Sequence, residues 1–334
     1  MFVHCFFTKF SSVMFMSVTV LVLSTFMMAS CNSWFSLWVC LELNMFMFIP
    51  VIMWGSTDNE EEGAVKYFII QSLASAMLLI SIFYSFNLSN FEVVMVYILV
   101  MAILMKMGSF PFIFWYTSVM KSISWVSCMI LSTWQKLGPL LILIFYINSL
   151  NKLFLFVSLI NVFIGGCAGC MQSDLRALMA YSSISHLGWM MSVLSGVYKM
   201  LSIIYFIMYT LLVLPIFFIM AFVNIKSMSM LFSINKISFS NLFSIMLLIL
   251  SLSGLPPLSG FMPKLMILNI LILDNFFMGL SMVIFSMLSM YMYLNMFFTF
   301  MLFYYLNMDL KLELDFVFML CVMISFMMLP VVMI

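Results

Sequence analysis

Apolar segments of about twenty residues recur along almost the whole chain, and they restrict its fold more than any other feature. A window of about 19 residues separates them at charges, at Pro or Gly and at polar clusters. Because lipid offers no hydrogen-bond partners, each membrane span must satisfy its own backbone, as a helix does. The sequence therefore predicts an all-α polytopic membrane protein with eleven spans: 10–30, 34–54, 65–86, 91–109, 123–147, 153–171, 175–194, 200–223, 240–272, 277–304 and 316–333.

Composition supports this interpretation and excludes other classes. Of the 334 residues, 66% are hydrophobic and 7% are charged, which is too much apolar surface for a water-soluble core. The linkers are too short for a soluble domain, so we expect residues 1–334 to form a single transmembrane domain. A net charge of +1 without a basic stripe argues against a nucleic-acid partner.

The basic residues between the predicted spans, or within two residues of a span end, predict the orientation of the chain. Two of them, Lys152 and Lys199, lie on the side opposite the N-terminus. The other side carries seven: Lys9, Lys66, Lys121, Arg176, Lys226, Lys236 and Lys311. The positive-inside rule places the N-terminus on the matrix or cytoplasmic side, and eleven spans place the C-terminus on the other side.

The segment LSGLPPLSGFMPK, residues 252–264, interrupts one predicted span. It holds two glycines and three prolines, and it ends at Lys264. Each proline removes a backbone donor and clashes with the carbonyl four residues earlier, so the helix cannot be continuous. Broken helices with a charge beside the break are how transporters build ion sites.

Two further lysines precede Gly and Pro in the same way. Lys106 is followed by Gly108 and Pro111. Lys136 is separated by one residue from Gly138 and Pro139. Interrupted spans in corresponding halves are typical of transporter folds with inverted repeats. The similarity between the halves is too weak to establish a repeat.

Four acidic or basic residues other than histidine lie more than two residues inside the predicted spans: Glu42, Lys106, Lys136 and Lys264. Each such group costs roughly 2.5 to 3.5 kcal/mol near the bilayer centre, so together they cost on the order of 10 kcal/mol. Burial favours a neutral lysine and a nearby carboxylate favours a charged one, so a small change of surroundings can switch its protonation. The four residues are therefore candidates for a proton relay. The alternatives are a purely structural ion pair for Glu42 and a lysine that reaches the membrane surface for Lys106.

His186 is a fifth candidate. It lies in AYSSISHLGWM beside Ser182, Ser183 and Ser185. Histidine titrates near neutral pH and could carry a proton between lysines. A packing histidine satisfied by hydroxyl groups is the alternative.

Motifs for redox or nucleotide chemistry are absent from the sequence. There is no G-x-G-x-x-G, no P-loop and no metal-ligand cluster, and the one CxxC, Cys167 and Cys170, lies in GGCAGC. That composition favours close helix packing over a metal or redox site. We expect no cofactor in this chain.

Five stretches together resemble the antiporter-like membrane subunits of mitochondrial NADH:ubiquinone oxidoreductase (respiratory complex I). The resemblance covers about residues 34–270, and the order and spacing of the stretches make it specific. The stretches are WVCLELNMFMFIP, VKYFIIQSLAS, KMGSFPFIFW with STWQKLGPL, LRALMAYSSISHLGWMM, and SGLPPLSGFMPK.

The resemblance assigns roles to the candidate residues. It implies that Glu42 and Lys106 form the family's Glu/Lys pair, that Lys136 is its central lysine, and that Lys264 belongs to its second broken helix. His186 matches the histidine between them. The antiporter-like core then covers about 34–272, followed by C-terminal helices at about 277–333. The chain departs from the family's pattern at five positions, Ile113, Thr117, Ser118, Ala177 and Leu265, while all four membrane charges are retained.

The function that the resemblance implies is proton translocation in the membrane arm, coupled to quinone reduction elsewhere in an enzyme complex of the mitochondrial inner membrane. NADH, FMN, iron-sulfur clusters and ubiquinone are then expected on other subunits. The expected partners are other membrane-arm subunits, including neighbouring antiporter-like chains, and lipid such as cardiolipin. The alternatives are a stand-alone cation/proton antiporter and a scaffold subunit whose buried charges only lock helices together.

Overall fold

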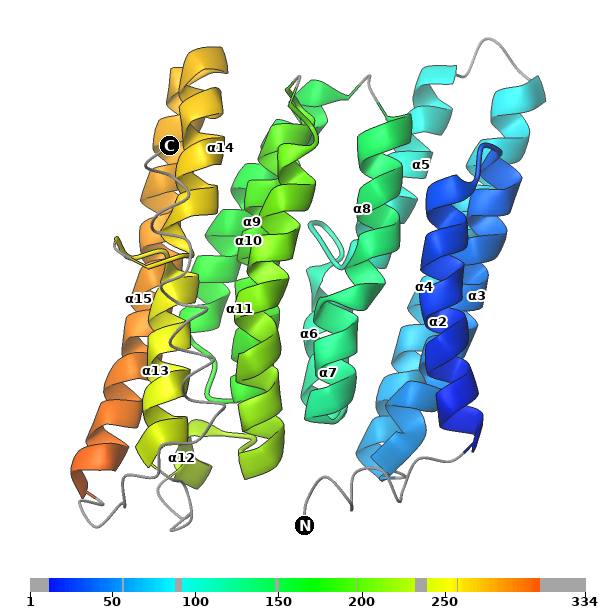
Figure 1. Cartoon of the computed structure of the whole chain (residues 1–334). Coiled ribbons are helices and arrows are strands. Elements are labelled where there is room, and N and C mark those ends of the chain that lie inside the picture. The colour runs from blue at the N-terminus through cyan, green and yellow to red at the C-terminus, as the bar shows by residue number, and fades with distance from the viewer. Residues whose placement is uncertain are drawn as a thin grey trace. The chain divides into compact units, whose positions relative to one another are not determined.

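The computed structural model describes residues 12–55, 57–87, 92–147, 150–196, 198–231, 239–256 and 258–306. Within these ranges the long regular elements are all helices (Figure 1). Seven of the described helices are long and apolar enough to cross a membrane, and Val94–Met107 and Leu242–Ser253 are shorter apolar helices. The predicted span 316–333 lies outside the described residues.

The chain divides into two compact units, Met1–Tyr146 and Ile147–Ile334. The first contains α2 (Ser12–Ser30), α3 (Trp34–Ile52), the 3-10 turn η1 (Met53–Gly55), α4 (Asp58–Asn87), α5 (Glu92–Met107), α6 (Ile113–Ser122), α7 (Trp125–Ser132) and α8 (Trp134–Tyr146). The second contains α9 (Asn151–Cys170), α10 (Leu175–Leu194), α11 (Leu201–Val223), α12 (Met228–Leu231), α13 (Phe239–Ser253), α14 (Phe261–Asp274) and α15 (Phe276–Leu306). The prediction of a single transmembrane domain stays a prediction.

Both units follow the same order of segments within the described residues. Apart from the short α12, three long helices come first, a pair of helices separated by several residues is fourth, and a further long segment is fifth, which is α7 with α8 in the first unit and α15 in the second. The broken segments are α5 with α6 in the first unit and α13 with α14 in the second. This correspondence, which sequence similarity does not establish, becomes visible in the order of the helices.

The break predicted at 252–264 is present. α13 ends at Ser253, Gly254 has a φ of 79°, and α14 begins at Phe261. A positive φ is the left-handed conformation that glycine adopts without the steric cost that a Cβ brings. Pro257 lies outside the described residues.

The lysine segments of the first unit differ from expectation in two places. Lys106 lies in the last turn of α5, near the end of its predicted span, but residues 113–122, which fall between two predicted spans, form the helix α6 after the break. Pro139 does not break its helix, because α8 runs through it to Tyr146 and the interruption lies at Thr133, between α7 and α8. Pro139 is the sixth residue of α8, beyond the first turn where a proline is tolerated best, and the helix nevertheless continues through it.

α10 forms the centre of the second unit, and most of its residues are buried. Glycines of α9 allow it to pack closely: a Cβ on Gly165 would lie 2.8 Å from the backbone nitrogen of Ser185. The GGCAGC motif therefore packs helices, as its composition predicts.

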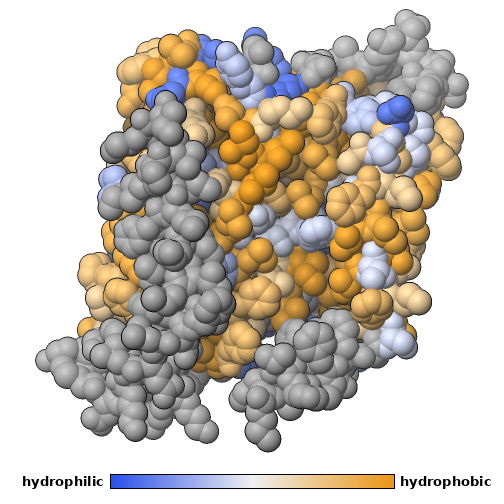
Figure 2. Space-filling view, viewed as in Figure 1, coloured by the Kyte–Doolittle hydropathy of each residue, from blue (hydrophilic) through white to orange (hydrophobic). Residues whose placement is uncertain are grey.

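The surface of the described helices is apolar. Figure 2 shows orange, hydrophobic side chains along most of the visible described face, with blue ones concentrated near its upper edge. Phe114, Leu273 and Phe277 are each more than 80% exposed. Patches of this extent are what lipid or neighbouring membrane subunits cover.

Candidate functional site

Glu42 and Lys106 face one another in the first unit. Glu42 lies on α3 and Lys106 in the last turn of α5, and the Lys106 Nζ is 3.7 Å from the Glu42 Oε1. The side chain of Lys106 is 3% exposed, and that of Glu42 is 13% exposed. The interpretation of Lys106 as a lysine that reaches the membrane surface is therefore wrong, since its amine is enclosed beside a carboxylate.

The end of α5 is satisfied without the amine of Lys106. Gly108, with a φ of 70°, turns the chain out of the helix. The carbonyls of Leu104, Met105 and Lys106 accept hydrogen bonds from Ser109, from the indole of Trp115 at 3.0 Å and from the amide of Gln71 at 3.2 Å. Because neutral groups donate to these three carbonyls, the helix end does not need the ammonium of Lys106, which can interact with Glu42 instead.

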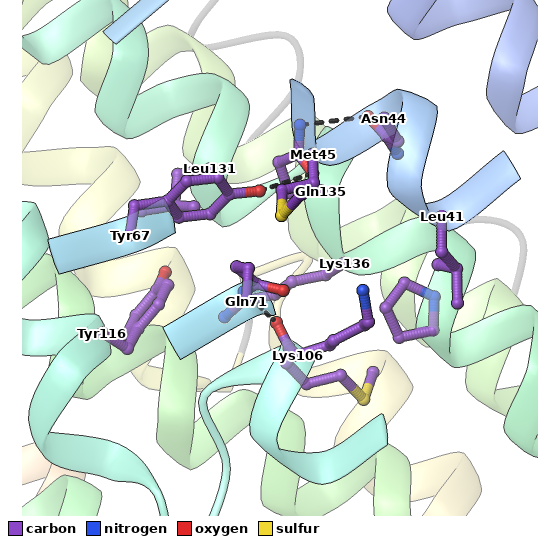
Figure 3. Close-up of a pocket in the computed structure, with 12 residues that line it drawn as sticks. Leu41, Asn44, Met45, Tyr67, Gln71, Lys106, Tyr116, Leu131, Gln135 and Lys136 are labelled. Atoms are coloured by element: carbon purple, nitrogen blue, oxygen red, sulfur yellow. Dashed lines mark hydrogen bonds between the residues drawn. The ribbon is translucent and has the colours of Figure 1, made fainter. Parts of the chain in front are cut away.

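Lys106 and Lys136 line the same small cavity (Figure 3). Its space for the centres of water molecules is about 20 Å³, and roughly 10 to 15 Å³ is needed for one water. The cavity can therefore hold about one water between the two lysines. Its lining residues are Leu41, Asn44, Met45, Tyr67, Gln71, Lys106, Met107, Tyr116, Leu131, Gln135, Lys136 and Pro139.

Neutral polar side chains link the wall of this cavity. The Tyr67 hydroxyl donates to the Oε1 of Gln135 at 3.4 Å, and the Gln135 amide donates to the Oδ1 of Asn44 at 3.1 Å. The sequence analysis did not select Tyr67, Gln71 or Gln135. The signal for Gln71 and Gln135 was a carboxamide inside an apolar span, which is costly in lipid unless it is paired; Tyr67 gave no such signal.

Lys136 lies in the first turn of α8 and is 2% exposed. Its Nζ is 4.5 Å from the centroid of the Tyr116 ring. A desolvated contact between a cation and an aromatic face contributes about 2 kcal/mol or more. Tyr116 therefore offers its aromatic face to the Lys136 amine and stabilises its charged form; this tyrosine was not predicted from the sequence.

Lys264 has a different partner in the second unit. Its Nζ donates to the Ser253 carbonyl at 2.8 Å, so the lysine of α14 caps the last turn of α13 across the break. A cation at the C-terminal end of a helix also interacts favourably with the helix dipole. The same amine lines a mainly apolar cavity of about 220 Å³ together with Trp189 of α10 and Ser286 of α15.

His186 lies between two tyrosines. Its Nδ1 is 2.8 Å from the Tyr205 hydroxyl, and its Nε2 is 3.3 Å from the Tyr293 hydroxyl. The neighbouring serines bond to backbone carbonyls of their own helix instead. The hydroxyl partners of this histidine therefore come from α11 and α15, which the sequence alone does not place beside it.

The structure thus gathers the candidate residues into two groups. Glu42, Lys106 and Lys136 meet in the first unit. His186 and Lys264 lie in the second, where Trp189, one turn after His186 on α10, lines the cavity of Lys264. Within the described ranges, no three His, Cys, Asp or Glu side chains come together as a metal site.

Replacing Tyr205 by Phe should test the hydroxyl contact of His186. The change removes one buried partner of a polar ring nitrogen, and such a loss costs about 1 to 3 kcal/mol. Thermal unfolding of the purified complex, monitored through the release of this chain, measures the loss of stability. Tyr291→Phe on the exposed side of α15 is the matched control and should leave the transition unchanged; equal effects of the two variants would contradict the assignment.

The sequence matches a described family over most of its length. The family model "NADH:quinone oxidoreductase/Mrp antiporter, TM" covers residues 31–289. NADH-ubiquinone oxidoreductase chain 2 of Lumbricus terrestris is 41% identical over 322 residues, which are 93% of this chain and 95% of the relative. The protein of the same name from Locusta migratoria is 36% identical, with 84% of this chain and 82% of the relative covered.

Solved structures share the fold at lower identity. A chain of respiratory complex I from Thermus thermophilus aligns with a TM-score of 0.81 at 20% identity, covering 96% of this chain and 78% of that one. A chain of the Mrp complex from Dietzia sp. aligns with a TM-score of 0.72 at 15% identity, covering 83% and 58%. The predicted all-α antiporter-like membrane fold is confirmed. Profile match and identity together show that this chain belongs to the NADH-ubiquinone oxidoreductase chain 2 family, within the NADH:quinone oxidoreductase/Mrp antiporter membrane proteins.

Proposed function

We propose that this chain translocates protons as a membrane-arm subunit of NADH:ubiquinone oxidoreductase in the mitochondrial inner membrane. The observation that carries the proposal is the shared cavity of Lys106 and Lys136, with Glu42 3.7 Å from Lys106. Three ionisable groups in an apolar protein are costly, and here they stand within reach of one another. In this scheme the driving force comes from quinone reduction on other subunits.

The first unit offers a short path for one proton. When Glu42 takes up a proton, the charged Lys106 loses its counter-ion and its deprotonation becomes easier. The released proton reaches Lys136 through the one water that the cavity can hold, while Gln135, Asn44 and Tyr67 offer donors and acceptors along the wall. Tyr116 stabilises the charge that arrives on Lys136.

In the second unit, Lys264 can cap the end of α13 whether its amine is charged or neutral. The amine of Lys264 donates to the Ser253 carbonyl, and a neutral amine still has hydrogens to donate and gains a lone pair. Lys264 can therefore release and regain a proton while the break stays capped. His186, with one ring nitrogen near each tyrosine hydroxyl, is the proposed carrier on the neighbouring helix α10.

The proposed orientation has the N-terminus on the matrix side and the C-terminus on the intermembrane-space side. In the first unit, a Cβ on Gly63 would touch Ser122, so the ends of α4 and α6 that carry Lys66 and Lys121 lie together. In the second, Leu175 donates to the Lys226 carbonyl, which places Arg176 beside Lys226. Each unit thus gathers lysines or arginine at one end, beside the acidic residues of α4 in the first unit, and the positive-inside rule counts only the basic residues.

Neighbouring membrane-arm subunits and lipid, including cardiolipin, are the partners we propose for the apolar surface. NADH, FMN, the iron-sulfur clusters and ubiquinone belong to other subunits in this proposal, and no cofactor belongs to this chain. The basic residues Lys9, Lys236 and Lys311, which also enter the orientation, lie outside the described residues.

Replacing Lys264 by Arg tests the proposal. Arginine keeps the charge and the donor to Ser253, but it does not release its proton in proteins. The adjoining cavity of about 220 Å³ accommodates the larger head group. A relay predicts that the complex assembles with normal thermal stability, while the number of protons pumped per electron falls measurably in proteoliposomes.

The same variant separates the two alternative functions. If the buried charges only lock helices, Lys264→Arg should pump normally, and that result would overturn the relay. A stand-alone antiporter predicts cation/proton exchange by liposomes that hold this chain alone. Absence of exchange by the isolated chain, together with pumping by the complex, would favour the membrane-arm subunit.

A further inference from the structure

Two cysteines that the proposed proton path does not use lie side by side in the first unit. Cys31 belongs to the linker between α2 and α3, and Cys40 lies in the second turn of α3. Their Sγ atoms are 3.9 Å apart. Close thiols are chemically different from isolated ones, because each can capture what the other becomes on oxidation.

The fold brings the two sulfurs together by simple geometry. Helical Cα–Cβ bonds tilt toward the helix start, so the side chain of Cys40 points back along α3 toward the linker. The linker is held there by Ser33, which caps α3, and by Tyr146, whose hydroxyl donates to the Cys31 carbonyl. These contacts keep Cys31 near the turn of α3 that carries Cys40.

We propose that Cys31 and Cys40 form a dithiol site that peroxide converts to an intrachain disulfide. The Cys31 thiolate attacks hydrogen peroxide, which gives a sulfenic acid on Cys31 and releases hydroxide. The Cys40 thiol then attacks the Cys31 sulfur, the S–O bond breaks, and water leaves. In sum, two thiols and one peroxide give one disulfide and two waters, so the sulfurs are oxidised and the peroxide oxygens are reduced.

Access to the site favours this order of events. Cys31 is partly exposed and lines a cavity of about 220 Å³ with Asn32 and Tyr146, which has room for a molecule as small as peroxide. Cys40 is buried behind it. The exposed thiol therefore meets the oxidant, and the buried thiol meets only the oxidised Cys31.

Closing the bond requires a small movement in a suitable place. A disulfide has its sulfurs about 2.05 Å apart, so the two atoms must approach from 3.9 Å. Residues 31–33 are outside any helix, so the linker can move while α3 stays intact. The linkage would tie the linker to the helix that carries Glu42, two residues after Cys40.

Cys167 and Cys170 provide a matched control in the same chain. They are one turn apart within α9, and the Cys170 thiol donates to the Leu288 carbonyl of α15. Residues at this helical spacing have Cβ atoms about 5 to 6 Å apart, whereas a disulfide needs about 3.5 to 4.5 Å. This second pair should therefore not form the bond.

The experiment treats the intact complex in its membrane with hydrogen peroxide, or in parallel with diamide, and then alkylates the remaining thiols under denaturing conditions. Chymotryptic peptides are analysed by mass spectrometry before and after reduction. The expected product joins 27–34 to 39–41, is two hydrogens lighter than the separate peptides, and disappears with dithiothreitol. Cys167 and Cys170 should stay alkylated.

A second measurement needs no oxidant. Phenylarsine oxide bridges two thiols that lie within reach, so it should protect Cys31 and Cys40 from alkylation and leave Cys128 unprotected. Alkylation of Cys31 and Cys40 to the same extent as Cys167 and Cys170 after both oxidants would overturn the proposal. So would oxidation of Cys31 to the sulfinic acid without a linked peptide. Neither result depends on whether the chain pumps protons.

Discussion

Replacing Lys136 by Met is expected to abolish coupled proton translocation while the complex still assembles. Methionine has nearly the length of lysine and no charge, and it can fill the site between Tyr116 and the small cavity. It cannot take up a proton. Because a positioned acid–base group typically contributes about 10²–10⁴-fold, NADH oxidation coupled to pumping should fall at least about a hundredfold.

The measurement is the number of protons moved per electron in proteoliposomes, with NADH oxidation by the uncoupled complex recorded beside it. Lys121→Met, the same substitution on an exposed lysine of α6, is the control and should pump normally. A Lys136→Met complex that assembles and pumps with an unchanged ratio would exclude Lys136 from the path. Arginine is not a useful replacement here, since a cavity that holds about one water leaves no room for it.

Replacing Glu42 by Gln is expected to destabilise the protein by at most about 3 to 5 kcal/mol, because Lys106 then either keeps a buried charge without its counter-ion or gives up its proton. The double variant Glu42→Gln with Lys106→Met removes both charges and should recover much of this loss. The pair stands at 3.7 Å, beyond normal hydrogen-bond distance, so the interaction is one of charge more than of geometry. A double-mutant cycle isolates the interaction free energy between the two charges.

Thermal unfolding of the four proteins of the cycle in one detergent measures the effect. The exposed pair Glu62 and Lys66, four residues apart on α4, is the matched control. Breaking it with Glu62→Gln should cost less than about 1 kcal/mol. Additive effects of Glu42→Gln and Lys106→Met would show that the buried pair is not coupled.

Much of the fold follows from the sequence because lipid leaves the backbone few choices. Apolar length predicts the helices, and Pro and Gly predict the break before Lys264. The same signals failed at Pro139, where α8 continues through the proline, and at 110–122, where a short helix follows the break after Lys106. Local residues do not reveal whether a short helix continues a span, because that depends on what packs beside it.

The sequence by itself determined which residues carry charge inside the membrane, because an ionisable group in an apolar run stands out by its cost. It selected Glu42, Lys106, Lys136, Lys264 and His186. Only the tertiary structure decided their partners: a carboxylate for Lys106, an aromatic face for Lys136, a helix end for Lys264 and two tyrosines for His186. Those partners lie on other helices, and the sequence does not fix which helices meet because apolar faces of similar composition can pack together in many ways.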